Sequence, residues 1–418
     1  MRSAARLAEV TLSRCRTLAS FSEDAGSLRR TYLSPPMRQV HREIAGWLAA
    51  LGMTTRIDAV GNLRAVYAGT DQSAPCLLIG SHLDTVPNAG FYDGMLGVVL
   101  AIALLEALEN RKLPYPIEVV GFSEEEGVRF GIPFIGSRAL VGRVDEQLLN
   151  NQDAAGASVR KAIEDFGLNP AEIPNAVINN DACAYLEFHI EQGPVLENLG
   201  RSLGVVETIA GQTRMDLVFT GRANHAGTTP MDLRFDAMAG AAEWITVVEQ
   251  TAKSIPGLVA TVGSVQTMPG ATNVIAAEAH LSLDVRHAAD NARRRAVEQF
   301  VDRAKEISQS RGLAVSSTIR LNQPAVSMDP GLTREVESAI REVGCRPHRM
   351  VSGAGHDAMI LAERIPCAMI FLRTPGGISH DPAESVYAED VSKAIECGLQ
   401  LLDQLASLPS FQPRTLRA

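Results

Sequence analysis

Two short apolar segments on either side of one strongly apolar helix constrain the fold of this chain more than any other feature. Residues 76–80 and 117–122 are apolar runs of strand length, and residues 97–108 between them have the composition of a buried helix. Strand, helix and strand in this order predict two parallel strands joined by a crossover. Polar and charged residues follow both strands directly. Because ligands bind beyond the carboxyl ends of the strands in such sheets, these residues are candidates for a functional site.

A region in the second half of the chain has a different order of elements. Apolar periodicity predicts four strands and two helices: strands near 215–220, 258–265, 277–285 and 313–321, and helices over 237–253 and 289–311. This β-α-β-β-α-β order is the ferredoxin-like pattern. The pattern of a parallel sheet resumes after it. We therefore expect an α/β catalytic domain in two parts, 1–211 and 326–418, interrupted by an α+β domain over 212–325.

Composition and charge exclude several classes of protein. The 418 residues include 39 Lys and Arg against 48 Asp and Glu, a net charge of −9, which argues against broad contact with nucleic-acid phosphates. The longest apolar stretch, 97–105, ends at Glu106 and is too short to span a bilayer. Six cysteines without a Cys-x-x-Cys pair indicate reduced thiols in a cytoplasmic protein. We expect no nucleic-acid partner and no membrane association.

Histidines and carboxylates gather where the predicted strands end. Taken singly, each histidine is more often structural, and three consecutive acids are more often a solvated surface segment. Together they fit a centre of two metal ions of the zinc, manganese or cobalt type, in which one carboxylate bridges the ions and another acts as base. The residues concerned are His82, Asp84, Asp93, Glu124, Glu125, Glu126, His189 and His380.

The chain resembles the amidohydrolase branch of the co-catalytic metallopeptidases, which includes allantoate amidohydrolase, N-carbamoyl-L-amino-acid hydrolase and β-ureidopropionase. The resemblance covers nearly the whole chain and implies a metallo-exopeptidase-like α/β/α catalytic domain with an inserted lid and dimerisation domain. Its specific motifs occur in order at residues 80–84, 92–94, 124–130, 189–194, 224–230, 353–358 and 379–380.

The resemblance implies a role for each residue of the centre. Glu125 matches the general base, and Asp84 matches the residue that orients a histidine ligand. His189 stands where related peptidases carry a carboxylate, as is typical of the carbamoyl branch, and Glu124 stands where family members carry Asp. The implied metal ligands are His82, Asp93, Glu126, His189 and His380, with Asp93 bridging two ions.

Other positions match substrate-binding residues of the family. His225 matches a lid histidine that stabilises the tetrahedral intermediate. Asn273 and Arg286 match positions that bind the substrate carboxylate, a group that the planar guanidinium of arginine can bind through paired hydrogen bonds. The further matches lie on one strand and in one pocket-lining loop: Gln212, Gly353, Ala354 and His356.

These matches imply an enzyme that uses two divalent ions per subunit to hydrolyse the ureido C–N bond of a small carboxylate, releasing ammonia and carbon dioxide. The similarity of residues 33–142 favours allantoate as the substrate. An N-carbamoyl-L-amino acid, or the substrate of a β-ureidopropionase, is the alternative, because these compounds share the ureido group and the carboxylate. The family also implies a homodimer formed through the inserted domain.

Three other functions fit the sequence less well. A dipeptidase is disfavoured by the motif that contains His189. A metal-free binding protein on the same scaffold is disfavoured because all five ligand positions and the base are present. A dinucleotide-binding oxidoreductase is excluded because no Gly-x-Gly-x-x-Gly motif follows the first predicted strand.

Overall fold

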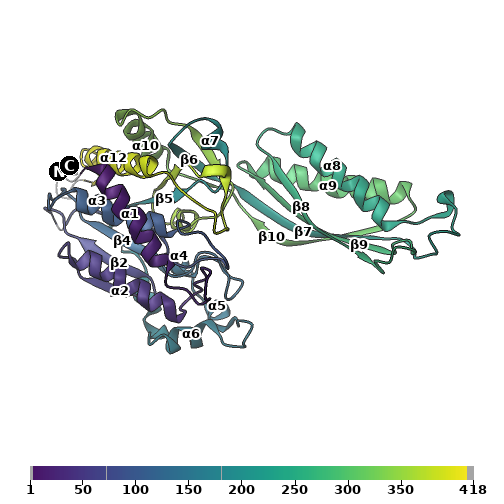
Figure 1. Cartoon of the computed structure of the whole chain (residues 1–418), viewed down its shortest axis with the longest axis horizontal. Coiled ribbons are helices and arrows are strands. Elements are labelled where there is room, and N and C mark those ends of the chain that lie inside the picture. The colour runs from purple at the N-terminus through teal and green to yellow at the C-terminus, as the bar shows by residue number, and fades with distance from the viewer. Residues whose placement is uncertain (1–2, 72, 180, 412–418) are drawn as a thin grey trace. The chain divides into compact units, whose positions relative to one another are not determined.

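The computed structural model describes residues 3–71, 73–179 and 181–411, and it divides the chain into two compact units (Figure 1). Unit 1 comprises Met1–Glu207 and Ser327–Ala418, and unit 2 comprises Thr208–Val326. Each unit has a hydrophobic core of its own. Helices and strands alternate through most of unit 1, which confirms the α/β fold class.

Unit 1 is built on a mixed sheet in the order β1-β2-β4-β3-β5-β13-β6-β11, with β12 paired to β6. Its strands are β1 (Thr55–Ile57), β2 (Leu63–Tyr67), β3 (Cys76–His82), β4 (Ile117–Phe122), β5 (Ala182–Ile190), β6 (Leu203–Ile209), β11 (Val326–Ser327), β12 (Arg349–Ser352) and β13 (Cys367–Leu372). The central strands β4, β3, β5 and β13 are parallel neighbours. Their carboxyl ends therefore meet at one edge of the sheet.

Helices cover the sheet of unit 1 on both faces, as the burial of every residue of β4 and β13 requires. Helix α3 packs against β3, β4 and β5, and it also contacts α1 and α12. Among the described residues, no helix combines the length and the apolar character needed to cross a membrane. The helices of unit 1 are α1 (Ala4–Ala19), α2 (Pro35–Ala49), α3 (Met95–Ala107), α4 (Ile135–Leu140), α5 (Glu146–Asn150), α6 (Val159–Asp165), α7 (Val195–Asn198), α10 (Pro330–Glu342), α11 (Asp357–Leu361) and α12 (Ala388–Leu405).

A glycine lets α3 approach the sheet closely. A Cβ atom added to Gly97 would lie 2.2 Å from the carbonyl oxygen of Phe188 on β5, so only glycine fits at this position. The start of α3 is thereby held against β5, the strand that carries His189. Apolar alternation does not reveal β5 in the sequence, because a strand that is buried on both faces has none.

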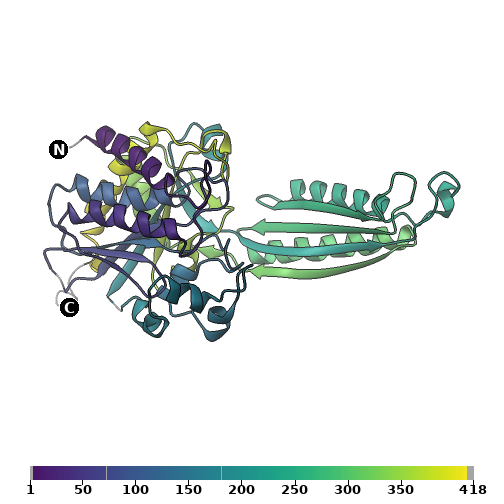
Figure 2. The same ribbon diagram turned by 60° about the horizontal axis from the view of Figure 1, so that its bottom comes forward.

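Unit 2 has the ferredoxin-like topology that its sequence predicts. Its elements are β7 (Gly211–Thr220), α8 (Ala237–Ser254), β8 (Val259–Met268), β9 (Glu278–His287), α9 (Asp290–Ser310) and β10 (Ala314–Gln323). The strands form an antiparallel sheet in the order β10-β7-β9-β8 and run side by side along the unit (Figure 2). Helices α8 and α9 cover one face, and burial alternates along β7 and β9 because the other face is open.

Candidate metal centre

The predicted metal ligands come together at the carboxyl edge of the sheet in unit 1. His82 is the last residue of β3, and His189 is the last residue but one of β5. Glu126 follows β4, and His380 follows β13 in the next loop. Asp93 lies directly before Gly94, the N-cap of α3. Four parallel strands and one helix start therefore supply five side chains to one place.

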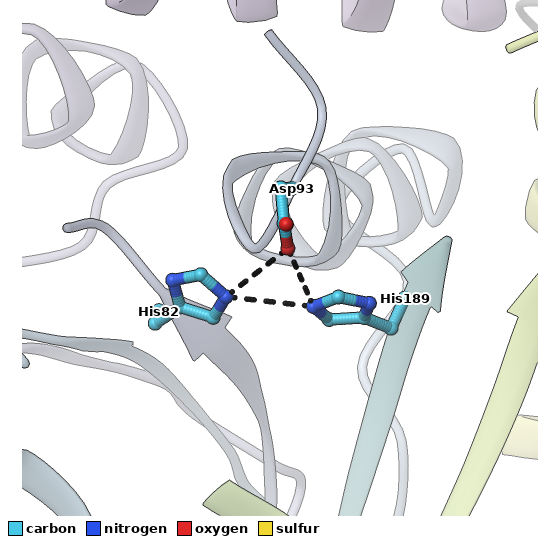
Figure 3. Close-up of side chains that lie close together, drawn as sticks. All are labelled: His82, Asp93 and His189. Atoms are coloured by element: carbon cyan, nitrogen blue, oxygen red, sulfur yellow. Dashed lines mark hydrogen bonds and ion pairs between the residues drawn. The ribbon is translucent and has the colours of Figure 1, made fainter. Parts of the chain in front are cut away.

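Two imidazole rings and one carboxylate converge in the interior of this cluster (Figure 3). Nε2 of His82 and Nε2 of His189 lie 3.4 Å apart. The same two atoms lie 3.4 and 3.2 Å from Oδ1 of Asp93. All three side chains are buried, with relative exposures of 1–3%.

Backbone carbonyls determine which ring nitrogen carries the proton in each histidine. Nδ1 of His82 lies 3.0 Å from the carbonyl oxygen of Asp84, and Nδ1 of His189 lies 2.9 Å from that of Ile190. A carbonyl oxygen can only accept, so each Nδ1 donates a hydrogen. A neutral ring then presents an unprotonated Nε2, which is the form of histidine that binds a metal.

Three atoms with lone pairs face one another at this point, so a positive charge placed between them would be stabilised. Burial lowers the pKa of His82, but its hydrogen bonds with Asp84 and Asp93 outweigh burial and raise that pKa well above its usual range. The pKa of His189 is raised in the same way, because its bond with Asp93 outweighs burial. The site thus attracts a cation, and imidazole with carboxylate is the donor set of zinc and similar divalent ions.

A second set of ligands shares Asp93 with the first. Nε2 of His380 lies 3.3 Å from Oδ2 of Asp93 and 3.6 Å from Oε1 of Glu126. Oδ1 of Asp93 faces the first set, whereas Oδ2 faces the second. Asp93, Glu126 and His380 are one of the groups in the described chain whose ligand atoms lie close enough to hold an ion. One carboxylate placed between two ligand sets is the arrangement that a two-metal centre requires.

Glu125 is buried beside the ligands but belongs to neither of these two sets. Asp84 accepts hydrogen bonds from the backbone N–H groups of Glu125, at 2.9 Å, and of Glu126, at 3.0 Å. Burial raises the pKa of Glu125 well above its usual range, and the negative charge of Glu126 adds to this shift. A carboxylate with such a high affinity for protons suits a general base, and a nearby cation would lower its pKa again.

Asp84 has a wider role than the orientation of one histidine. Its carboxylate lies 3.5 Å from Nδ1 of His82, while the backbone oxygen of Asp84 is nearer, at 3.0 Å. The shorter bonds of the carboxylate go to the backbone after β4. Asp84 therefore links the end of β3 to the segment that carries Glu125 and Glu126.

The predicted pocket loop meets the first ligand set through His356. The rings of His356 and His189 are edge to face with their centroids 4.5 Å apart. Burial lowers the pKa of His356 well below its usual range, so this ring is neutral. Gly353 and Ala354 lie in the same loop, between β12 and α11.

The predicted substrate residues of unit 2 form two pairs at opposite ends of its strands. Gln212 and Arg286 are direct neighbours across β7 and β9, and both donate to the carboxylate of Asp284, at 2.7 and 2.8 Å. His225 follows β7. The backbone N–H of the next residue, Ala226, donates a hydrogen bond of 2.9 Å to the carbonyl oxygen of Asn273. A strand rises about 3.3 Å per residue, so the ends of β7 lie roughly 30 Å apart.

Three residues that the sequence did not single out contact the centre. Nε2 of Gln192 donates to Oδ2 of Asp93 at 2.9 Å and to Oγ of Ser379 at 3.1 Å. Glu384 accepts bonds from the backbone of the segment that carries Asp93. Gln192 and Ser379 lie within the family motifs, close to His189 and next to His380. This position is the signal in the sequence that could have pointed to both residues. Glu384 lies outside every motif.

The chain belongs to the peptidase family M20/M25/M40, whose family model matches residues 78–404. It is 37% identical over 435 residues to an allantoate deiminase from Arabidopsis thaliana, a match that covers 96% of this chain and 82% of the relative. It is 36% identical to an N-carbamoyl-L-amino acid amidohydrolase from Geobacillus stearothermophilus, covering 92% of this chain and 95% of the relative. A crystal structure of an amidase of the hydantoinase/carbamoylase family from Burkholderia multivorans superposes with a TM-score of 0.91 at 29% identity, covering 96% of this chain and 98% of that chain.

Proposed function

We propose that this chain is a metal-dependent amidohydrolase that cleaves the ureido C–N bond of a small carboxylate. Allantoate is the first candidate substrate, and an N-carbamoyl-L-amino acid is the alternative. The observation that carries the proposal is the convergence of His82, Asp93 and His189 beside the buried base Glu125. The names of the relatives support both substrates, which share the ureido group and the carboxylate.

The donor set fits two divalent ions of the zinc, manganese or cobalt type. One ion would be held by His82, Asp93 and His189, and the other by Asp93, Glu126 and His380. When bound, such ions polarise a carbonyl group and lower the pKa of water. The opposite directions of the two oxygens of Asp93 support this assignment.

Glu125 performs the proton transfers. It takes a proton from the attacking water as the new C–O bond forms at the ureido carbon, and it delivers this proton to the leaving nitrogen as the C–N bond breaks. The carbamate that results loses carbon dioxide. In sum, one ureido group and one water yield an amine, carbon dioxide and ammonia. Asp84 holds the backbone of Glu125 in place during both transfers.

The hydrogen bonds around His225 leave its ring with an N–H group that can donate to the oxyanion of the tetrahedral intermediate. Its Nδ1 accepts bonds from the backbone N–H groups of Gly227, at 3.0 Å, and Thr228, at 3.2 Å. The proton of the neutral ring therefore sits on Nε2, which leaves an exposed N–H donor. Arg286, Asn273 and Gln212 would bind the substrate carboxylate and so determine the orientation of the ureido group.

A comparison of substrates tests the proposal directly. Metal-loaded protein is incubated with allantoate, with a series of N-carbamoyl-L-amino acids and with dipeptides, and ammonia and free amine are measured. We expect turnover of at least one ureido compound and none of the dipeptides. Turnover of N-carbamoyl amino acids without turnover of allantoate would establish the alternative substrate. Hydrolysis of dipeptides alone would contradict the proposal.

We also propose a homodimer, because the predicted substrate residues of unit 2 in one chain, called the lid residues below, cannot all reach one substrate molecule. The pair Gln212 and Arg286 and the pair His225 and Asn273 lie at opposite ends of ten-residue strands. A small ureido carboxylate is much shorter than the roughly 30 Å between those ends. Two copies of the chain would supply one pair each to a common site.

Mixing two inactive variants tests this arrangement. Arg286→Ala and His225→Ala should each lose most activity, since each removes one kind of substrate contact. Co-expression of the two variants should restore about a quarter of the wild-type activity, because half of the dimers are mixed and each mixed dimer has one complete site. If both pairs acted within a single chain, no mixture would regain activity. Light scattering should give twice the chain mass of 44.8 kDa.

We place the enzyme in the cytoplasm on the state of its thiols. All six cysteines lie among the described residues, and none of them forms a disulfide there. Burial raises the pKa of Cys367 well above its usual range, so this thiol is unreactive. Free thiols of this kind are typical of a reducing compartment.

A further inference from the structure

Glu384 joins two loops of the metal centre that lie far apart in the sequence. Its Oε1 accepts hydrogen bonds from the backbone N–H of Tyr92, at 2.9 Å, and of Asp93, at 3.1 Å. Its Oε2 accepts a bond of 3.3 Å from the hydroxyl of Ser379. The side chain lies in the interior, since Glu384 has a relative exposure of 4%. One carboxylate thus holds the loop of the bridging Asp93 and the loop of His380 together.

The neighbourhood of Glu384 is shaped to admit this carboxylate. A Cβ atom added to Gly90 would lie 2.4 Å from both Cβ and Oε1 of Glu384, so a side chain at position 90 would displace it. The bonds of Glu384 also go to N–H groups that precede Gly94, the N-cap of α3. Glu384 therefore does not act as a cap of α3. Its hydrogen bonds hold the segment before the helix, which carries Asp93.

His380 depends on such support more than the other ligands do. Its side chain has a relative exposure of 49%, whereas those of His82 and His189 have 1–2%. Its backbone has a φ of +56°, a left-handed conformation that costs energy in residues other than glycine. His380 belongs to a loop and not to a strand, so packing of the sheet does not position it.

We propose that Glu384 is a positioning residue that fixes the Asp93 loop to the His380 loop, and so sets the spacing of Asp93, Glu126 and His380 for the second metal ion. The inference rests on the proposed function, since it requires that a metal ion binds to this set. His380 serves only the second set, and His82 and His189 hold the first set without it. Loss of Glu384 should therefore weaken the second ion more than the first.

Titration of metal-free protein with Co²⁺, followed by calorimetry and visible absorption, tests this inference. Wild-type protein should bind two ions. Glu384→Ala should bind one ion nearly normally and the other about 10- to 100-fold more weakly, as is typical when a group that supports a ligand is removed. Glu384→Gln should bind both ions within a few-fold of wild type, because its amide oxygen still accepts the two backbone bonds.

Two further variants separate positioning from a loss of folding. Asp329→Ala removes a carboxylate that caps α10 through the N–H of Leu332, and it should lower the melting temperature without changing either affinity. Gly90→Ala keeps Glu384 but displaces it, and it should weaken the second ion even if Glu384→Ala fails to fold.

Two results would overturn the positioning role. One is wild-type affinity for both ions in folded Glu384→Ala protein. The other is an equal loss in Glu384→Gln and Glu384→Ala, which would show that the charge of Glu384 acts and its hydrogen bonds do not. Failure of the wild-type protein to bind any ion would instead contradict the proposed function itself.

Discussion

Replacing Glu125 by glutamine should abolish hydrolysis while both metal ions stay bound. The amide of glutamine has nearly the same shape as the carboxylate, but it cannot accept the proton of the attacking water. General base catalysis contributes about 10²- to 10⁴-fold to a rate, so kcat should fall by roughly this factor. Ammonia release from the best ureido substrate measures the loss, and metal analysis of the same sample measures the bound ions.

The neighbouring acid provides a matched control for this experiment. Glu124 is also buried, and burial raises its pKa well above its usual range, with the charge of Asp84 adding to the shift. Glu124 belongs to none of the ligand groups found among the described residues, so Glu124→Gln should retain activity within a few-fold. Full activity in Glu125→Gln, or an equal loss in Glu124→Gln, would show that Glu125 is not the base.

Replacing Asp93 by alanine should remove both metal ions, whereas replacing His380 by alanine should remove only one. Asp93 has one oxygen toward each ligand set, and His380 contacts the second set alone. Loss of a direct ligand should weaken binding by more than the roughly 100-fold seen for groups that only support a ligand. Metal content after dialysis, followed by titration, distinguishes zero, one and two bound ions.

Removal and return of metal complete this test. A chelator should abolish ureido hydrolysis in the wild-type protein, and zinc, manganese or cobalt should restore it. Neither variant should recover full activity in this way. Two ions retained by Asp93→Ala would contradict the bridging role and, with it, the two-metal arrangement.

The types of residue in the centre could be predicted because each strand end is encoded locally. An apolar run followed by His82 and Asp84, or by Glu125 and Glu126, is visible within a few residues. The same is true of the ferredoxin-like unit, whose alternating strands and helices leave their periodicity in the sequence. The strand that carries His189 was not predicted, because burial on both faces removes that periodicity.

Glu384 could not be predicted, because its role consists only of contacts across the chain. It lies 291 residues from Asp93 in the sequence and four residues after His380, in a loop without apolar periodicity. Its carboxylate faces the backbone of the Asp93 loop only because β13 and α3 bring those loops together. Gln192 was overlooked for the same reason, although it lies within a recognised motif.

The distance between the two pairs of lid residues is the second feature that could not be predicted from the sequence. Gln212, His225, Asn273 and Arg286 all match substrate-binding positions, and nothing in their spacing shows that they form two pairs. The antiparallel register of β7 and β9 places Gln212 beside Arg286 and leaves the other pair at the far end. This placement supports the homodimer that we propose.

The sequence by itself determined the chemistry available to this protein and its division into an α/β unit with an inserted α+β unit. Residue type and periodicity are local properties, and they persist in the chain whatever its fold. Only the tertiary structure decided which atoms meet. It brings together the unprotonated nitrogens of His82 and His189, and it turns one oxygen of Asp93 toward each ligand set. It also places the carboxylate of Glu384 against the backbone of the Asp93 loop. The contact between the two histidines joins positions 107 residues apart, and the contact of Glu384 with Asp93 joins positions 291 residues apart, so no local pattern records them.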